Sequence, residues 1–161
     1  MKNTDYDLIC KQFIELSSDT RDYLPLISNL SALLFQSISD INWAGFYLRK
    51  SEALILGPFQ GKPACMRIES GKGVCGKAFL EDEIQRVDNV HDFPGHIACD
   101  VASNSEIVVP IHDHDSGEVI GVLDIDSQII SRFDESDEKG LSCIIRELEN
   151  AADFTGLLKN G

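Results

Sequence analysis

The chain has 161 residues, 27 of them acidic and 14 basic, which gives a formal net charge of −13. A chain of this length can bury one substantial core, so we expect a single domain over residues 1–161. The negative charge predicts repulsion from nucleic acid and from anionic membranes. No apolar stretch approaches the length of a membrane span and the first residues are polar, so we expect a cytoplasmic protein.

The first third of the chain combines helical and strand patterns. Apolar residues recur at near-helical spacing over 5–18 and again over 20–37, which predicts two amphipathic helices. An aromatic, β-rich run follows over 41–48, and a second apolar run covers 52–56 after a short polar turn. These two runs predict a β-hairpin. A third strand is expected over 65–68.

The rest of the chain predicts further strands around one long irregular connection. The segment 88–105 is rich in Asp, Asn, Gly, Pro and His, and a connection of this length is typical of a lid or binding loop. The other predicted elements are a helix over 74–81, strands over 84–87, 106–111 and 119–125, and a terminal helix that begins near Asp134. Together they indicate an α+β fold, with a mainly antiparallel central sheet, helices on one face and the long loop on the other.

The five cysteines divide into two groups. Cys65, Cys75 and Cys99 lie in segments where glycine or proline is close by, and a partly exposed cysteine in a turn can form a reactive thiolate. Cys10 and Cys143 fall on apolar helical faces and are interpreted as packing residues. An odd number of cysteines in a chain of this length favours reduced or cycling thiols over a structural disulfide framework. The pattern predicts thiol redox chemistry.

Two aromatic and three acidic residues are candidates for a binding pocket. Trp43 and Tyr47 are four residues apart on one predicted strand, so they share a face at a separation of roughly 13 Å. Asp124 and Asp126 also share a face, and Glu106 could add a third carboxylate. Such carboxylates could bind an ammonium group and share a proton, so that one serves as a general acid. Ordinary solvation at a strand end is the alternative, and spacing alone leaves both interpretations open.

Two other patterns point to bound groups, and neither is favoured. Cys65, Cys75, Cys99 and His96 could form a Cys₃His zinc site, but the paired short spacings typical of structural zinc are absent. Residues 71–76 match GxGxxG, yet no parallel βαβ series follows, as a dinucleotide-binding fold requires. We therefore expect no metal and no cofactor.

Several short motifs, in the expected order from about residue 20 to 150, carry a resemblance to a known family. The chain resembles the free methionine-(R)-sulfoxide reductases, which are stand-alone GAF domains. The resemblance therefore implies a GAF-like fold. The motifs are Asn42-Trp43-Ala44-Gly45-Phe46-Tyr47, residues 56–61 and 71–76, Gly95-His96-Ile97-Ala98-Cys99-Asp100, residues 105–110, and Gly121-Val122-Leu123-Asp124-Ile125-Asp126-Ser127.

The resemblance also implies roles for individual residues. Cys99 matches the cysteine that attacks the sulfoxide sulfur, Cys65 matches the resolving cysteine that forms a disulfide with it, and Cys75 matches a third cysteine with an auxiliary role. The residues that match the family's substrate pocket are Trp43, Tyr47, Glu106, Asp124 and Asp126. Sulfoxide reduction needs a sulfur nucleophile, an acid and a second thiol, and these residue types supply all three.

The expected activity is thus reduction of free methionine (R)-sulfoxide through a cysteine sulfenic acid and an intramolecular disulfide. The resemblance further implies thioredoxin as the reductant and a homodimer. A GAF binding module that senses a small ligand or redox state is the alternative, because fold alone does not decide function. A pure ligand sensor would need none of the three loop thiols.

Overall fold

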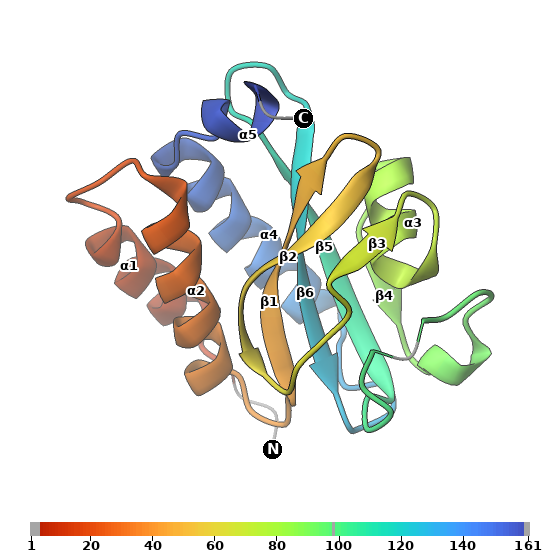
Figure 1. Cartoon of the computed structure of the whole chain (residues 1–161). Helices are drawn as coiled ribbons and strands as arrows, with labels where there is room; N and C mark the ends of the chain where they lie inside the picture. Colours follow the sequence, from red (N-terminus) through yellow and green to blue (C-terminus); the bar gives the residue numbers. More distant parts are fainter. Residues whose placement is uncertain (1–3, 98, 160–161) are drawn as a thin grey trace.

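The computed structural model describes residues 4–97 and 99–159, and a six-stranded sheet forms its centre (Figure 1). The strand order is β3-β2-β1-β6-β5-β4, and each of these neighbouring pairs is antiparallel. The strands are β1 (Trp43–Lys50), β2 (Ala53–Gly61), β3 (Arg67–Glu69), β4 (Gln85–Val87), β5 (Ser105–His112) and β6 (Val119–Ser127). The helices are α1 (Tyr6–Leu16), α2 (Tyr23–Ser37), α3 (Gly73–Glu81), α4 (Glu135–Ala151), α5 (Thr155–Lys159) and the 3-10 helix η1 (Val90–Asp92).

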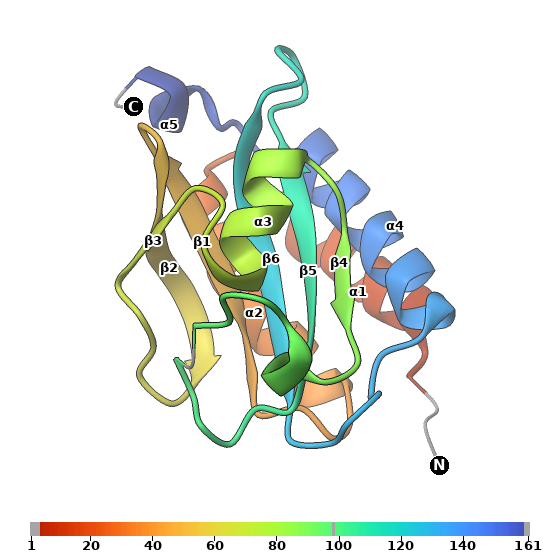
Figure 2. The same ribbon diagram turned by 90° about the vertical axis from the view of Figure 1, so that its right-hand side faces the viewer.

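The two faces of the sheet are covered differently. Helices α1, α2 and α4 lie on one face, while α3 and the green segments 88–97 and 99–105 lie on the other (Figures 1 and 2). Strand β6 illustrates the difference between the two faces: Leu123 and Ile125 pack in the helical core, while Val122 and Asp124 point to the face of α3. This is the period-two alternation of a strand with a different environment on each side. The predicted α+β fold is confirmed, and the structure adds α3 to the face of the loop.

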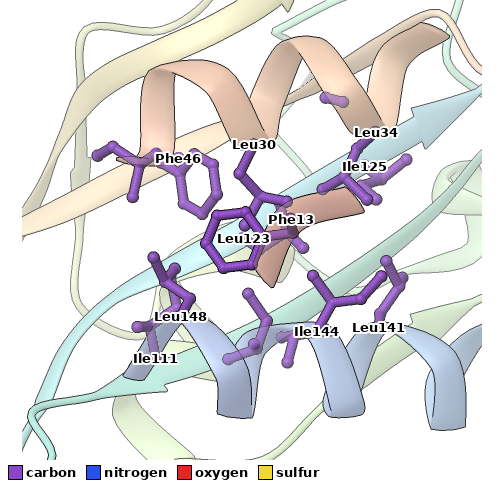
Figure 3. Packing of buried hydrophobic residues seen from close by; sticks show 14 of the residues in the cluster. Phe13, Leu30, Leu34, Phe46, Ile111, Leu123, Ile125, Leu141, Ile144 and Leu148 are labelled. Atoms are coloured by element: carbon purple, nitrogen blue, oxygen red, sulfur yellow. The ribbon is translucent and has the colours of Figure 1, made fainter. Parts of the chain in front are cut away.

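The main core lies between the sheet and the three helices. Figure 3 shows Phe13 of α1, Leu30 of α2 and Ile144 of α4 converging on Leu123 of β6. All four side chains are fully buried. Burying a side chain of this size contributes roughly 1.5–3 kcal/mol relative to leaving it exposed. The helical face therefore supplies most of the apolar burial, which leaves the opposite face free to carry polar groups.

A buried polar cluster fixes the start of α4 and ties it to α1. Asp134 and Asp137 form a capping box, in which each side chain accepts a backbone N–H of the other. The Arg132 guanidinium pairs with Asp137 at 3.5 Å and donates to the Ser39 carbonyl oxygen. The Tyr6 hydroxyl donates to Asp137 Oδ1 at 2.7 Å. Because these polar groups satisfy one another, Arg132 and Asp137 can be buried at little cost.

The predicted elements agree with the observed ones except at a few places. Strand β2 continues to Gly61, beyond the predicted 52–56, and the short helix α5 was not predicted. The interpretation of Cys143 as a packing residue is wrong, because its side chain is exposed. Its neighbours Ile144 and Ile145 face the core, while the exposed Cys143 lies beside Cys10 of α1. No helix within the described residues is long and apolar enough to cross a membrane.

A single histidine joins the end of β5 to both helical layers. His112 Nε2 lies 2.7 Å from the Asp82 carboxylate at the end of α3, and its Nδ1 lies 3.0 Å from Glu149 of α4. Burial alone would lower the pKa of His112, but the hydrogen bonds to Glu149 and Asp82 outweigh it, so the pKa is raised. The imidazolium form thus links two helices that cover opposite faces of the sheet.

This linkage predicts a pH-dependent contribution to stability. Because the pKa of His112 in the folded state lies above the unfolded value of about 6.5, protonated His112 contributes its full stabilisation below about pH 6.5. The contribution is lost as the pH rises through the raised folded value. We expect His112→Gln to lower the free energy of unfolding more at about pH 5.5 than at about pH 9, measured by urea denaturation. His114→Gln, at an exposed position in the same turn, is the control; equal losses for His112→Gln at both pH values would contradict the expectation.

Candidate functional site

Strand pairing brings the predicted acidic and aromatic residues together on the face of α3. In the registers of β6 with β5 and β1, Asp126 lies opposite both Glu106 and Trp43. Asp124, two residues earlier, lies opposite Gly45, which separates the two aromatic positions of β1. A residue with a side chain at Gly45 would collide with Phe59 of β2, so the glycine permits close packing of the strands here. The site is thus built on adjacent strands at the centre of the sheet.

A glycine-rich turn places Cys75 over these strands. Gly71 N–H donates to the Gly76 carbonyl oxygen at 2.8 Å, and a Cβ on Gly76 would lie 2.6 Å from the Glu69 carbonyl oxygen. Gly73 has a φ of 63°, which favours glycine. The pattern that matches GxGxxG therefore serves the tight entry into α3, and it holds Cys75 buried in the first turn of that helix.

These elements enclose a pocket of about 390 Å³, counting the space at its mouth. Its acidic floor comes from β5 and β6, and its roof from α3 and the loop after η1. The lining residues are Tyr47, Ile68, Lys72, Gly73, Val74, Cys75, His96, Ile97, Cys99, Asp100, Ser103, Glu106, Asp124 and Asp126.

The two predicted aromatic residues have different positions. Tyr47 lines the pocket, and its hydroxyl donates to the Cys65 carbonyl oxygen at 2.9 Å. Trp43 is not among the lining residues; it stacks on Tyr47 at 5.9 Å and on Phe59 at 5.2 Å between ring centroids. Its indole N–H donates to the Lys62 carbonyl oxygen. Trp43 therefore supports Tyr47 and the connection that carries Cys65.

A disulfide joins Cys65 to Cys99 across the mouth of the pocket, with the Cα atoms 5.4 Å apart. It connects the segment between β2 and β3 with the long loop, 34 residues further on. Asp100 holds the loop beside the bond, since its carboxylate accepts from Asn42 Nδ2 at 3.0 Å and from the Ala102 N–H at 2.9 Å. Both cysteines lie in connections between strands and not within the strands themselves.

Burial raises the pKa values of the acidic groups in the pocket. Burial is the main cause for Glu106 and Asp126, and the negative charge of Asp124 adds to it in both cases. Burial also raises the pKa of Asp124, to about 6, against hydrogen bonds to Glu106 and Cys75 that lower it. The pKa of the Cys75 thiol is raised by burial and then by the nearby carboxylates. The pocket therefore retains protons near neutral pH and can transfer them to a bound molecule.

Three donor atoms at the floor of the pocket are close enough to share one ligand. Cys75 Sγ donates to Glu106 Oε1 at 3.7 Å, and both atoms lie within 4.8 Å of an Asp124 oxygen. Asp124 Oδ1 is buried without a hydrogen-bond partner. The four-residue zinc site considered from the sequence is not assembled, because Cys65 and Cys99 are bonded to each other.

Sequence analysis missed several lining residues. Lys72 lies at the start of α3, Ile97 contacts Gly73, and Ser103 accepts from the Asn42 side chain at 3.0 Å. These residues come from turns and a loop, where no periodic pattern shows which way a side chain points. The one signal that could have identified these lining residues is that they lie close to Cys75 or Cys99 in the sequence.

Comparisons with known proteins agree with this architecture. A model of the GAF domain matches residues 25–152. Free methionine-R-sulfoxide reductase of Escherichia coli (strain K12) is 47% identical over 158 residues, which cover 98% of this chain and 94% of that protein. Protein YtsP of Bacillus subtilis (strain 168) is 51% identical over 152 residues, covering 93% and 92%. A solved structure of fRMsr of Staphylococcus aureus, in complex with substrate, has a TM-score of 0.89 at 49% identity and covers 95% of this chain and 99% of that one.

The fold and the matched family model define the class of the protein: this chain belongs to the GAF domain family. Within that family, its full-length similarity is to proteins named free methionine-R-sulfoxide reductase, and the resemblance seen in the sequence motifs is confirmed.

The raised pKa of Asp124 predicts how stability depends on pH. Its folded value of about 6 lies above the unfolded value of about 3.9, so its contribution is present below about pH 4 and is lost as the pH rises through about 6. We therefore expect Asp124→Asn to flatten the fall in unfolding free energy between about pH 4 and pH 7, followed by denaturation at each pH. Glu15→Gln, on the exposed side of α1, should leave the native slope unchanged. An unchanged slope in Asp124→Asn would show that this carboxyl group titrates normally.

Proposed function

We propose that this chain reduces free methionine (R)-sulfoxide to methionine, using Cys99 as nucleophile and Cys65 as resolving thiol. The observation that carries the proposal is the Cys65–Cys99 disulfide at the mouth of a buried acidic pocket. Support also comes from the relatives of E. coli and Saccharomyces cerevisiae that are named for this activity. The chain would then be an oxidoreductase that acts on a sulfur group and contains a single GAF domain.

The proposed reaction needs two thiols and one protonated group. The Cys99 thiolate attacks the sulfoxide sulfur, and the sulfoxide oxygen takes up a proton. Transfer of the resulting hydroxyl group to Cys99 leaves methionine and a cysteine sulfenic acid. The Cys65 thiol then attacks the sulfenic sulfur, which forms the disulfide and breaks the S–O bond; the displaced hydroxide takes up the proton of that thiol and leaves as water. In sum, the sulfoxide is reduced by two electrons and the two thiols are oxidised by two.

The pocket floor is the proposed source of the proton. Glu106 and Asp126 have pKa values raised well above the ordinary range, so they hold protons when exposed carboxyl groups have lost theirs. Cys75, whose own pKa is raised, stays a thiol and donates its hydrogen bond to Glu106. We assign Cys75 an auxiliary role through this contact, because a buried neutral thiol is a poor nucleophile.

The two ends of a free amino acid find opposite charges in the pocket. Its ammonium group would be bound by Asp124 of β6, whose pKa of about 6 leaves it mostly ionised at neutral pH. Its carboxylate would face the first turn of α3, where N–H groups point outward and the capping residue Lys72 makes no side-chain hydrogen bond to them. Both ends of the ligand are held, so a peptide-bound methionine sulfoxide would lack the charges and would not fit. Tyr47 offers an aromatic surface for the S-methyl group.

A thioredoxin-like protein is the proposed reductant of the disulfide. Three exposed apolar side chains adjoin the two bonded cysteines in the sequence: Met66 is 78% exposed, Val101 85% and Ile97 38%. Exposed apolar side chains close to the two cysteines in the sequence could contribute to the docking of a reductant. A homodimer and a cytoplasmic location are further parts of the proposal, and they rest on the resemblance and on the use of reducible thiols.

The proposal predicts a specific pattern of turnover. With racemic free methionine sulfoxide and a thioredoxin system, half of the substrate should be consumed, namely the R epimer, while a peptide-bound sulfoxide is untouched. Chiral chromatography of the remaining substrate is the measurement. Absence of turnover with fully reduced thiols would favour the alternative of a ligand-sensing GAF module.

The two cysteines should fail in different ways when replaced. We expect Cys99→Ser to abolish turnover, whereas Cys65→Ser should form about one methionine per chain and then stop, because the sulfenic acid is not resolved. Rapid-quench measurement of methionine per active site separates the two. Cys143→Ser is the matched control and should keep full turnover, since this exposed thiol lies on α4, outside the pocket. Multiple turnovers by Cys65→Ser would mean that another thiol resolves the intermediate.

A further inference from the structure

Within the described part of the chain, the acidic floor of the pocket forms no ion pair. Glu106 and Asp124 are each only 6% exposed, and neither takes part in an ion pair within residues 4–97 and 99–159. A buried carboxylate without a partner is costly unless it takes up a proton or binds a cation. Each of these carboxyl groups therefore either holds a proton or binds a cation that comes from solution.

Cys75 turns part of this floor into a set of metal ligands. Its thiol sulfur, one oxygen of Glu106 and one of Asp124 lie within 4.8 Å of one another. Tetrahedral zinc with a Zn–S distance of about 2.3 Å and a Zn–O distance of about 2.0 Å requires an S···O separation of roughly 3.5 Å. The observed Cys75 Sγ to Glu106 Oε1 distance is 3.7 Å, so a metal fits between them with little movement.

A second observation points to a missing ligand at the same place. Asp124 Oδ1 is buried and accepts no hydrogen bond, although a buried carboxylate oxygen ordinarily has a partner. Its residue belongs to the same three-residue group as Cys75 and Glu106, and it lines the pocket. A cation between the three donors would satisfy this oxygen.

We propose that Cys75, Glu106 and Asp124 bind a divalent transition-metal ion, with Zn²⁺ as the preferred species. One thiolate and two carboxylates favour zinc over magnesium or calcium, which take oxygen ligands alone. Three protein ligands leave a fourth position open toward the pocket. The ion is not a cofactor for the proposed reduction. The ion occupies the acidic floor that would hold the amino-acid substrate, so the metal ion and the substrate exclude each other. This competition rests on the proposed function, whereas the binding of the metal ion does not.

Cobalt spectroscopy on the oxidised protein tests the site directly. The Cys65–Cys99 disulfide removes those two sulfurs as ligands, and the double variant Cys10→Ser/Cys143→Ser removes the two remaining thiols outside the pocket. Cys75 is then the single free thiol. We expect Co²⁺ to bind one per chain, with a thiolate-to-cobalt absorption band in the near ultraviolet and visible bands of a tetrahedral ion. Zn²⁺ should displace it.

Three substitutions in this background locate the ligands. Cys75→Ser should abolish the charge-transfer band, and Glu106→Gln and Asp124→Asn should each weaken Zn²⁺ binding by at least roughly tenfold in competition with a chromogenic chelator. Glu15→Gln, which removes an exposed carboxylate, should leave the affinity unchanged. Circular dichroism of each variant confirms that it is folded.

Two results would overturn the site. One is cobalt binding without the sulfur band. The other is an affinity for Zn²⁺ that survives Cys75→Ser in a folded protein, which would place the ion on surface carboxylates. Because the readout is spectroscopic, a protein without reductase activity would still show the site, and a reductase without the cobalt band would refute the site alone. Displacement of Co²⁺ by free methionine then tests whether the two ligands exclude each other.

Discussion

Three carboxyl groups on one face of two neighbouring strands are the constraint on which the rest of the structure depends. Glu106, Asp124 and Asp126 lie beneath α3 and the long loop, where an ionised carboxylate loses most of its hydration. The strands can carry these groups because their other face is packed by Leu123, Ile125 and the helices behind them. One face of the sheet contributes the apolar core and the other carries the acidic pocket. Successive side chains of β6 point alternately to these two faces.

The roof of the pocket follows from the same constraint. A flat acidic strand face would be solvated and would titrate as ordinary carboxyl groups do. Helix α3 and the loop exclude water from it, and the tight glycine turn between Glu69 and Gly76 sets the distance of the helix from the sheet. The Cys65–Cys99 disulfide closes the mouth from two separate connections.

The sequence predicted the sheet and helices well because their periodicities are local. Strict apolar spacing marked α2 and α4, and the two hairpins were marked by apolar runs on either side of short turns. The length of β2 was missed because glycine and proline near residue 57 suggested a turn, whereas the strand passes through them. Cys143 was misplaced because it adjoins Ile144 and Ile145, and one residue on a helix changes the direction of a side chain by about 100°. The face of a loop residue such as Ser103 depends on tertiary packing and has no local signal.

Sequence motifs identify the individual residues of the site, whereas only the three-dimensional structure shows which of them contact one another. Motifs identified Cys75, Glu106 and Asp124 individually, from segments far apart in the chain. Only the fold shows that the Cys75 thiol donates to Glu106, and that Asp124 keeps an unpartnered oxygen beside them. This contact separates the roles of the cysteines. Burial and neighbouring negative charge keep Cys75 protonated, while Cys65 and Cys99 are half-exposed at the mouth, where a thiolate is hydrated and accessible to substrate. A cation on the floor would reverse the protonation of Cys75, because a metal ion requires the thiolate. On the proposals above, protons, an ammonium group and a metal ion would compete for one set of buried carboxyl groups, and the occupant would set the protonation of Cys75.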